Sequence, residues 1–258
     1  MTRRKYSTEV IAHRGFSGRA PENTPAAFRL ALESRADRVE FDVLLTRDGV
    51  PVVIHDALLD RTTNGRGLVA EMDLSAIRAL DAGSWFDPRF AGERVPTLDE
   101  TLALCSDRIA VNVEIKEEAV VPGTCRPESI ESRVIEALRR YGLLGSAVVS
   151  SFDLLSTQRI RQLEPSLACE ILFNRPGGFP TLSDLEAVKS GGFRGLSLST
   201  DELRGWPEVV ARAHELGLGV KVYTVDDPTE MAMLLDLGVD GIFTNRPDLL
   251  ASLVHPTV

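Results

Sequence analysis

Short runs rich in Val and Ile alternate with helix-like patterns along most of the chain, and this alternation constrains the fold more than any other feature. Eight runs are typical of buried strands: 10–14, 38–46, 110–116, 147–151, 168–173, 194–198, 219–225 and 240–244. Eight helical patterns accompany them: 25–36, 98–106, 128–141, 153–163, 181–190, 207–217, 227–237 and 247–253. Eight strand–helix units are what a (β/α)8 barrel requires, so we predict this α/β fold. An open doubly wound sheet has the same periodicity but usually fewer units.

Local signals mark the ends of several predicted helices. Thr24 followed by Pro25 is typical of a helix start. Thr97 and Glu100 have the spacing of a capping box. Three glycines follow helical runs where a left-handed backbone is preferred: Gly142, Gly191 and Gly217. The helix predictions therefore depend on end signals as well as on periodicity.

Residues 47–96 do not fit the alternation. Arg47-Asp48-Gly49 has the composition of a hairpin turn that leads into a strand ending at His55. The remainder is rich in glycine and holds one short helical pattern near 73–81. We interpret residues 57–96 as an insertion after the second strand, placed over the C-terminal mouth of the barrel.

Composition limits the class of protein. Hydrophobic residues make up 43% of the 258 residues, and we predict a single domain over 1–258. The formal charge of −9 argues against nucleic acid as a partner. No run approaches the ~18 apolar residues of a membrane span. Cys105, Cys125 and Cys169 are widely spaced, as in proteins with reduced thiols. We expect a cytoplasmic protein without stable membrane association; its oligomeric state is left open.

Charged residues interrupt two predicted strands at a spacing of two. Side chains alternate along a strand, so Glu40 and Asp42 lie on the same face of their strand. Glu114 and Lys116 likewise lie on one face of theirs. Their apolar neighbours would face the helices, which leaves the charged groups inside the barrel. Unpaired carboxylates would be costly there, and a divalent cation would relieve that cost. Oxygen ligands favour Mg²⁺ or Ca²⁺ over zinc.

Two histidines end predicted strands near this acidic group. His13 ends the first strand beside Arg14, and His55 ends the strand after the hairpin turn. Two imidazoles with pKa values near ~6.5 can accept and donate protons at neutral pH. A guanidinium suits bidentate phosphate binding. Together these groups suit an anionic phosphoester and a divalent cation.

Each of these groups also has a structural interpretation that the residues alone leave open. The carboxylates of the second strand would be solvated at a sheet edge, and Glu114 with Lys116 would form a structural ion pair. Arg14 would pair with Glu22. The histidines would be satisfied structural groups.

The ordered set of motifs resembles the glycerophosphodiester phosphodiesterases over about residues 10–250. The matching stretches are His13-Arg14-Gly15, Pro21-Glu22-Asn23-Thr24, Glu40-Phe41-Asp42-Val43, Thr46-Arg47-Asp48-Gly49, Val53-Ile54-His55-Asp56, Asp60-Arg61-Thr62-Thr63-Asn64-Gly65, Pro96-Thr97-Leu98, Asn112-Val113-Glu114-Ile115-Lys116 and Gly241-Ile242-Phe243-Thr244-Asn245. A single HRG motif would be weak evidence, but the ordered set is highly specific.

The resemblance implies a TIM barrel that hydrolyses small glycerophosphodiesters to glycerol 3-phosphate and an alcohol. It also implies site roles: one divalent cation, Mg²⁺ or Ca²⁺, on Glu40, Asp42 and Glu114; acid–base catalysis by His13 and His55; phosphate binding by Arg14 and Lys116. Following the family, our hypothesis is attack by the substrate's own glycerol 2-hydroxyl, through a cyclic phosphate that is then hydrolysed.

The outer pocket departs from the family pattern. Tyr223 stands where many relatives have tryptophan; we expect it to face inward against the substrate, with barrel packing as the alternative. Phe152 ends the fourth strand and has the same two interpretations. Two further pairs are expected, with unrelated charges and plain packing as their alternatives: Lys221 with Glu170 as an ion pair, and Trp85 with Phe86 as an apolar lip for a longer leaving group.

Two other functions compete with this one. A lysophospholipase D-like hydrolase of lipid phosphodiesters would need an exposed apolar patch or an interfacial helix at the mouth. A non-catalytic barrel would lack one of the histidines or metal carboxylates, and none is missing. The sequence does not name the alcohol that is released.

Overall fold

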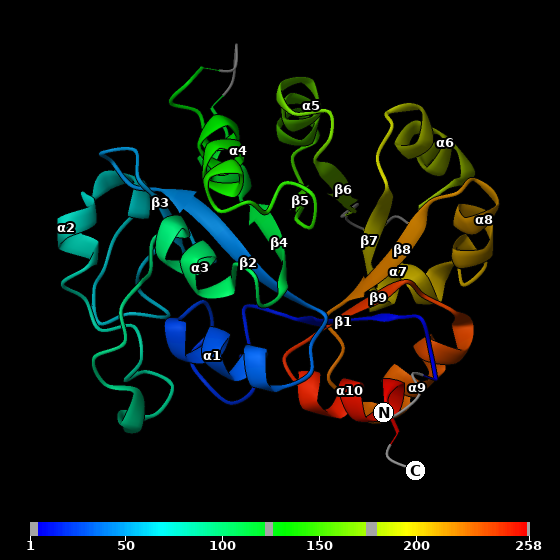
Figure 1. The fold of residues 1–258 in the computed structure, drawn as a ribbon, viewed down its shortest axis with the longest axis horizontal. Helices are drawn as coiled ribbons and strands as arrows, with labels where there is room; N and C mark the ends of the chain where they lie inside the picture. Colours follow the sequence, from blue (N-terminus) through cyan, green and yellow to red (C-terminus); the bar gives the residue numbers. More distant parts are fainter. Residues whose placement is uncertain (1–4, 122–125, 174–179, 257–258) are drawn as a thin grey trace.

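Eight parallel strands form a closed barrel in the computed structural model, which describes residues 5–121, 126–173 and 180–256. The barrel closes because β1 pairs with both β2 and β9. Its strands are β1 (Glu9–Ala12), β2 (Arg38–Leu45), β4 (Ala110–Ile115), β5 (Val148–Ser151), β6 (Ala168–Leu172), β7 (Gly195–Ser199), β8 (Gly219–Tyr223) and β9 (Gly241–Thr244). Figure 1 shows the helices around the outside of these strands, so the predicted TIM barrel is confirmed.

The helices match the predicted ones, with one addition. They are α1 (Pro25–Glu33), α3 (Leu98–Cys105), α4 (Ile130–Arg140), α5 (Leu154–Leu163), α6 (Leu182–Ser190), α7 (Thr200–Gly205), α8 (Val209–Glu215), α9 (Pro228–Leu237) and α10 (Pro247–Val254). Sequence periodicity misses α7 because its 6 residues are too few to show a helical repeat. None of the helices in the described ranges has the length and apolar character that crossing a membrane requires.

Most of the predicted helix ends are confirmed. The Thr24 side chain caps α1, and Thr97 forms a capping box with Glu100 at the start of α3. Gly142 and Gly217 have φ angles of +70° and +73°, in the left-handed region. The prediction for Gly191 is wrong: its φ is −65°, and the left-handed residue is the next one along the chain. Gly191 is still nearly helical, so the chain turns one residue later than the pattern indicates.

The stretch between β2 and α3 leaves the barrel, as predicted. A turn with Gly49 at φ +75° leads into β3 (Pro51–Val53), which pairs antiparallel with the C-terminal end of β2. The rest is irregular except for η1 (Val69–Glu71), α2 (Leu74–Ile77) and η2 (Pro88–Phe90); a further short element, η3 (Glu117–Ala119), follows β4. In Figure 1 the stretch lies beside β2, α1 and α3.

Alternation along β2 separates the apolar core from the barrel interior. Val39 and Phe41 are buried, and the Phe41 ring meets Phe28 of α1 edge-on at 5.7 Å. Glu40 and Asp42 point to the opposite face, where each is only 1% exposed. The barrel interior is therefore charged at this strand, whereas the main apolar core lies between strands and helices.

Two of the three cysteines are described. Cys105 and Cys169 are buried free thiols, and burial raises the pKa of each to about 12. A raised pKa keeps a thiol protonated, and the protonated form is a poor nucleophile. Cys125 lies outside the described residues.

Candidate active site

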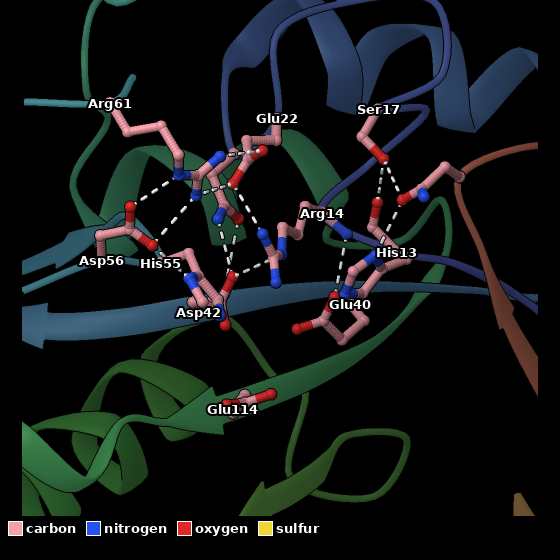
Figure 2. A network of polar contacts seen from close by, with 12 residues as sticks. His13, Arg14, Ser17, Glu22, Glu40, Asp42, His55, Asp56, Arg61 and Glu114 are labelled. Atoms are coloured by element: carbon pink, nitrogen blue, oxygen red, sulfur yellow. Dashed lines mark hydrogen bonds and ion pairs between the residues drawn. The ribbon is translucent and has the colours of Figure 1, made fainter. Parts of the chain in front are cut away.

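Five of the sequence-predicted residues meet at the C-terminal end of the barrel. Asp42 of β2 lies directly opposite Glu114 of β4 in the strand register, and Glu40 is one inward position earlier. His13 follows the end of β1, and His55 follows β3. Because parallel strands direct their carboxyl ends to one side, residues distant in sequence converge there (Figure 2).

The three carboxylates form one compact cluster. Oxygen atoms of Glu40, Asp42 and Glu114 all lie within 4.8 Å of one another. Among the described residues, Glu40 Oε1 and Asp42 Oδ1 are buried without a hydrogen-bond partner. Lys116 Nζ lies 2.8 Å from Glu114 Oε1 and 3.7 Å from Asp42 Oδ1, so it partly compensates the negative charge.

Burial and mutual repulsion raise the pKa of two of these carboxyl groups, whereas neighbouring cations lower that of the third. Burial, followed by the charge of Asp42, raises the pKa of Glu114 to about 7 and that of Glu40 well above its usual value. Burial acts in the same sense on Asp42, but the charges of Arg14 and Lys116 and other nearby groups together outweigh it and lower the pKa of Asp42. A divalent cation would bind the carboxylate oxygens that lack partners, and its charge would favour the ionised form of these groups. The three carboxylates therefore fit such an ion.

Arg14 pairs with Glu22 and also lines the pocket, so the two interpretations of its role are compatible. Its Nη1 donates to Glu22 Oε1 at 2.7 Å, and its Nε lies 3.3 Å from Asp42 Oδ2. Its backbone N–H donates to Glu40 Oε2 at 2.9 Å, and its φ of +54° turns the chain sharply after β1. The guanidinium is thus held by carboxylates while its side chain still lines the central pocket.

His13 is held through its Nδ1 atom. This nitrogen lies 2.8 Å from Asn245 Oδ1, and Asn245 Nδ2 donates to Asp226 Oδ2 at 2.7 Å. Since that donation fixes the amide orientation, His13 Nδ1 carries the proton in this pair and Nε2 is left to accept one. Burial, with the nearby Arg14 charge, lowers the pKa of His13 to about 4, so the ring is neutral at neutral pH.

His55 is held by a carboxylate. Its Nδ1 lies 2.5 Å from Asp56 Oδ1, and Asp56 in turn accepts from Arg61. Asp56, Arg61 and Asn245 had no role in the sequence interpretation, although each stands in a matched motif. Motif membership was their only signal, because their partners lie on other segments of the chain.

A pocket of about 140 Å³ joins these groups. Its lining comprises His13, Arg14, Glu40, His55, Glu114, Phe152, Leu172, Tyr223, Thr224 and Phe243. Tyr223 meets Phe152 and Phe243 edge-on, with ring centroids 6.1 and 6.5 Å apart. The Tyr223 hydroxyl donates its proton to the Phe173 carbonyl at 2.7 Å, so it has no second proton to donate to a substrate. Phe152 and Tyr223 therefore form an apolar wall of the pocket.

Four other charged residues of the predicted set lie outside this lining: Asp42, Lys116, Lys221 and Glu170. Lys116 Nζ lies 6.0 Å from the ring centroid of Phe152, which does line the pocket. The expected ion pair of Lys221 with Glu170 is confirmed at 2.8 Å between Nζ and Oε1, buried inside the barrel.

The expected apolar lip is wrong. Phe86 lines a separate groove of about 810 Å³ beside α1, and the Trp85 indole N–H donates to the Ala82 carbonyl. Neither side chain lines the pocket with the histidines. Aromatic content in the insertion indicated an apolar surface, but its place depended on tertiary packing.

Fold and site together define a barrel enzyme whose acidic and imidazole groups meet at one mouth. The family model "Glycerophosphoryl diester phosphodiesterase family" matches residues 13–249. The chain belongs to this family of phosphoric diester hydrolases.

Individual relatives agree. A glycerophosphodiester phosphodiesterase of Caldanaerobacter subterraneus subsp. tengcongensis is 40% identical over 96% of this chain and 98% of its own. A putative glycerophosphoryl diester phosphodiesterase from Silicibacter pomeroyi superimposes with a TM-score of 0.85 at 31% identity, covering 98% of this chain and 95% of its own. An Oleispira antarctica phosphodiesterase, solved with the product sn-glycerol-3-phosphate, has a TM-score of 0.82 at 30% identity, covering 94% of each chain.

Proposed function

We propose that this chain hydrolyses small glycerophosphodiesters to glycerol 3-phosphate and an alcohol, using a divalent cation and two histidines. One observation carries the proposal: both histidines, Glu40 and Glu114 line a single pocket, and Asp42 completes the carboxylate cluster of the two glutamates. The product bound to the Oleispira antarctica relative supports glycerol 3-phosphate as the product here.

Glu40, Asp42 and Glu114 would hold one cation, Mg²⁺ or Ca²⁺, and a bound cation supplies charge stabilisation at the phosphoryl oxygens. The Arg14 guanidinium, already oriented by Glu22, would bind the same oxygens from its side of the pocket. The Lys116 ammonium group, which pairs with Glu114, would add positive charge near the phosphate.

The histidines would move the protons. His13 is neutral and offers Nε2, so it can accept the proton of the attacking hydroxyl. His55 also has its Nδ1 engaged, which leaves Nε2 for exchange with the substrate. We propose that the glycerol 2-hydroxyl attacks phosphorus and forms a cyclic phosphate, while the bond to the alcohol breaks and a histidine protonates the leaving oxygen. Water then opens the ring to give glycerol 3-phosphate.

Pocket size favours a small substrate over the lysophospholipase D-like alternative. A volume of about 140 Å³ suits a glycerol phosphate unit but is below the ~300–1,000 Å³ typical of drug-sized ligands. Two aromatic side chains of the insertion, Phe86 and Phe90, line another groove. A cytoplasmic location remains a prediction from the sequence.

Two experiments test the mechanism. Replacing His13 or His55 by alanine should lower turnover by roughly 10²–10⁴-fold. A substrate analogue without the 2-hydroxyl should not be turned over, and undiminished turnover would exclude internal attack. Near-normal activity of both alanine variants would refute the acid–base assignment.

A further inference from the structure

Arg61 forms two hydrogen-bonded forks with carboxylates from different segments. Its Nε and Nη2 donate to Asp56 at 2.6 and 3.0 Å. Its Nη1 and Nη2 donate to the two oxygens of Glu22, each at 2.8 Å. Glu22 belongs to the loop after β1 and Asp56 to the segment after β3, so one guanidinium joins both loops (Figure 2).

Each of these carboxylates also holds a residue of the proposed site. Asp56 Oδ1 lies 2.5 Å from His55 Nδ1, and Glu22 Oε1 accepts from Arg14 Nη1 at 2.7 Å. Arg61 itself comes from the insertion and does not line the pocket. It acts on the pocket through its two partners.

We propose that Arg61 is a positioning residue that sets the orientation of His55 and Arg14 together. This inference depends on the proposed function for the roles of those two residues. Asp56, fixed by the first fork, keeps the His55 proton on Nδ1 and leaves Nε2 for the substrate. Glu22, fixed by the second fork, holds the Arg14 guanidinium at the pocket wall.

The geometry favours orientation over stability as the reason for this arrangement. Arg61 is 43% exposed, so solvent screens its ion pairs and reduces their contribution to folding, although bidentate geometry strengthens them. Two bidentate contacts nevertheless define the plane of the guanidinium. A lysine offers a compact charge without a planar fork, so it cannot hold both carboxylates in these orientations.

The kinetics of three variants separate the effect of Arg61 on His55, through Asp56, from its effect on Arg14, through Glu22. Asp56→Asn should lower kcat about 10–100-fold, because it releases His55, with little change in KM. Glu22→Gln should mainly raise KM, because it releases the phosphate-binding Arg14. Arg61→Lys should do both. A purely structural role for Arg61 would lower the active fraction, which reduces kcat and leaves KM unchanged.

Arg47→Lys is the matched control. Arg47 also forms a fork with one carboxylate, Asp73, in the same part of the chain, but this pair contacts neither histidine. Its replacement by lysine should leave kcat and KM as in the wild type.

A spectroscopic measurement tests the inference without using activity. In protein labelled with ¹⁵N-histidine, the wild type and Arg47→Lys should show a slowly exchanging Nδ1 proton for His55. Arg61→Lys should broaden or lose that signal. If the wild type hydrolyses no glycerophosphodiester, the proposed function fails, while this spectrum still tests the positioning.

Wild-type kinetics and an intact His55 signal in Arg61→Lys would overturn the inference. If Arg61→Lys does not fold, Asp56→Asn still tests the contact with His55, and Glu22→Gln still tests the contact with Arg14. Identical kinetic effects from those two variants would also contradict it.

Discussion

At the scale of single residues, the two histidines have different Nδ1 partners. The partner of His13 is the neutral amide of Asn245, and that of His55 is the carboxylate of Asp56. His13 is also buried beside the positive charge of Arg14, and these two effects lower its pKa to about 4. Its protonation state is therefore linked to folding.

This linkage predicts a pH dependence of stability. The unfolded chain protonates His13 near 6.5, whereas the folded protein does so only near 4. The unfolded state therefore binds more protons in this window, and the free energy of unfolding falls as the pH falls from about 6.5 to about 4. His13→Gln should lose this component. Urea unfolding of both proteins in chelator, from pH 4 to 7.5, measures it; a pH-independent difference would contradict the prediction.

Glu40 gives a second prediction at this scale. Its Oε1 atom is buried without a partner among the described residues, while its carboxyl pKa is raised mainly by burial. In the presence of chelator, Glu40→Gln should raise the free energy of unfolding by about 1–3 kcal/mol, because it removes a costly buried charge. Added Mg²⁺ or Ca²⁺ should stabilise the wild type and not the variant. Thermal melts check both results, and equal stabilisation of the two proteins would exclude Glu40 as a ligand.

At the scale of elements, the site depends on contacts between loops. Gly18, in the loop after β1, donates its N–H to the Asn245 carbonyl at 2.9 Å, at the junction of β9 and α10. A Cβ atom on Gly18 would lie 2.5 Å from that carbonyl oxygen. The close approach keeps the Asn245 amide beside His13.

Gly18→Ala should therefore displace the two loops from each other. We expect a loss of about 1–3 kcal/mol in the free energy of unfolding, together with lower turnover. Gly145→Ala is the control, because a Cβ atom there has no heavy atom within 4 Å. Denaturant unfolding and glycerol 3-phosphate release compare the two variants. Wild-type values for Gly18→Ala would show that the close approach is unimportant.

At the scale of the whole molecule, charged residues cross the interior of the barrel. Arg38 of β2 pairs with Glu9 of β1 at 2.9 Å, and Glu9 lies 3.4 Å from Lys221 of β8. Lys221 continues to Glu170 of β6 at 2.8 Å. Two positive and two negative side chains from four strands thus compensate one another inside the closed sheet.

Removing one of these four charged side chains should destabilise the barrel more than removing an oppositely charged pair. Lys221→Met should cost about 3–5 kcal/mol, because it leaves Glu170 buried without its cation. The double variant Lys221→Met with Glu170→Leu should recover most of that loss. Denaturant unfolding of the single and double variants measures the coupling energy. Additive losses would show that the two side chains do not interact.

The sequence predicts the barrel well because eight repeated units each leave a local signal. Glu40, Asp42 and Glu114 were predictable for the same reason, since spacing and strand alternation place them on the inner face. The role of Arg61 was not predictable, because its forks join segments whose spacing in the chain carries no information about distance. The place of Phe86 was missed for the same reason.

The most direct test of the proposed function is a direct assay of glycerol 3-phosphate release. Purified protein is incubated with a panel of glycerophosphodiesters that differ in the alcohol, with Mg²⁺ or Ca²⁺ and with chelator. We expect release from small, deacylated substrates that chelator abolishes and added cation restores. No release, release that chelator leaves unchanged, or turnover of acylated substrates alone would contradict the proposed function.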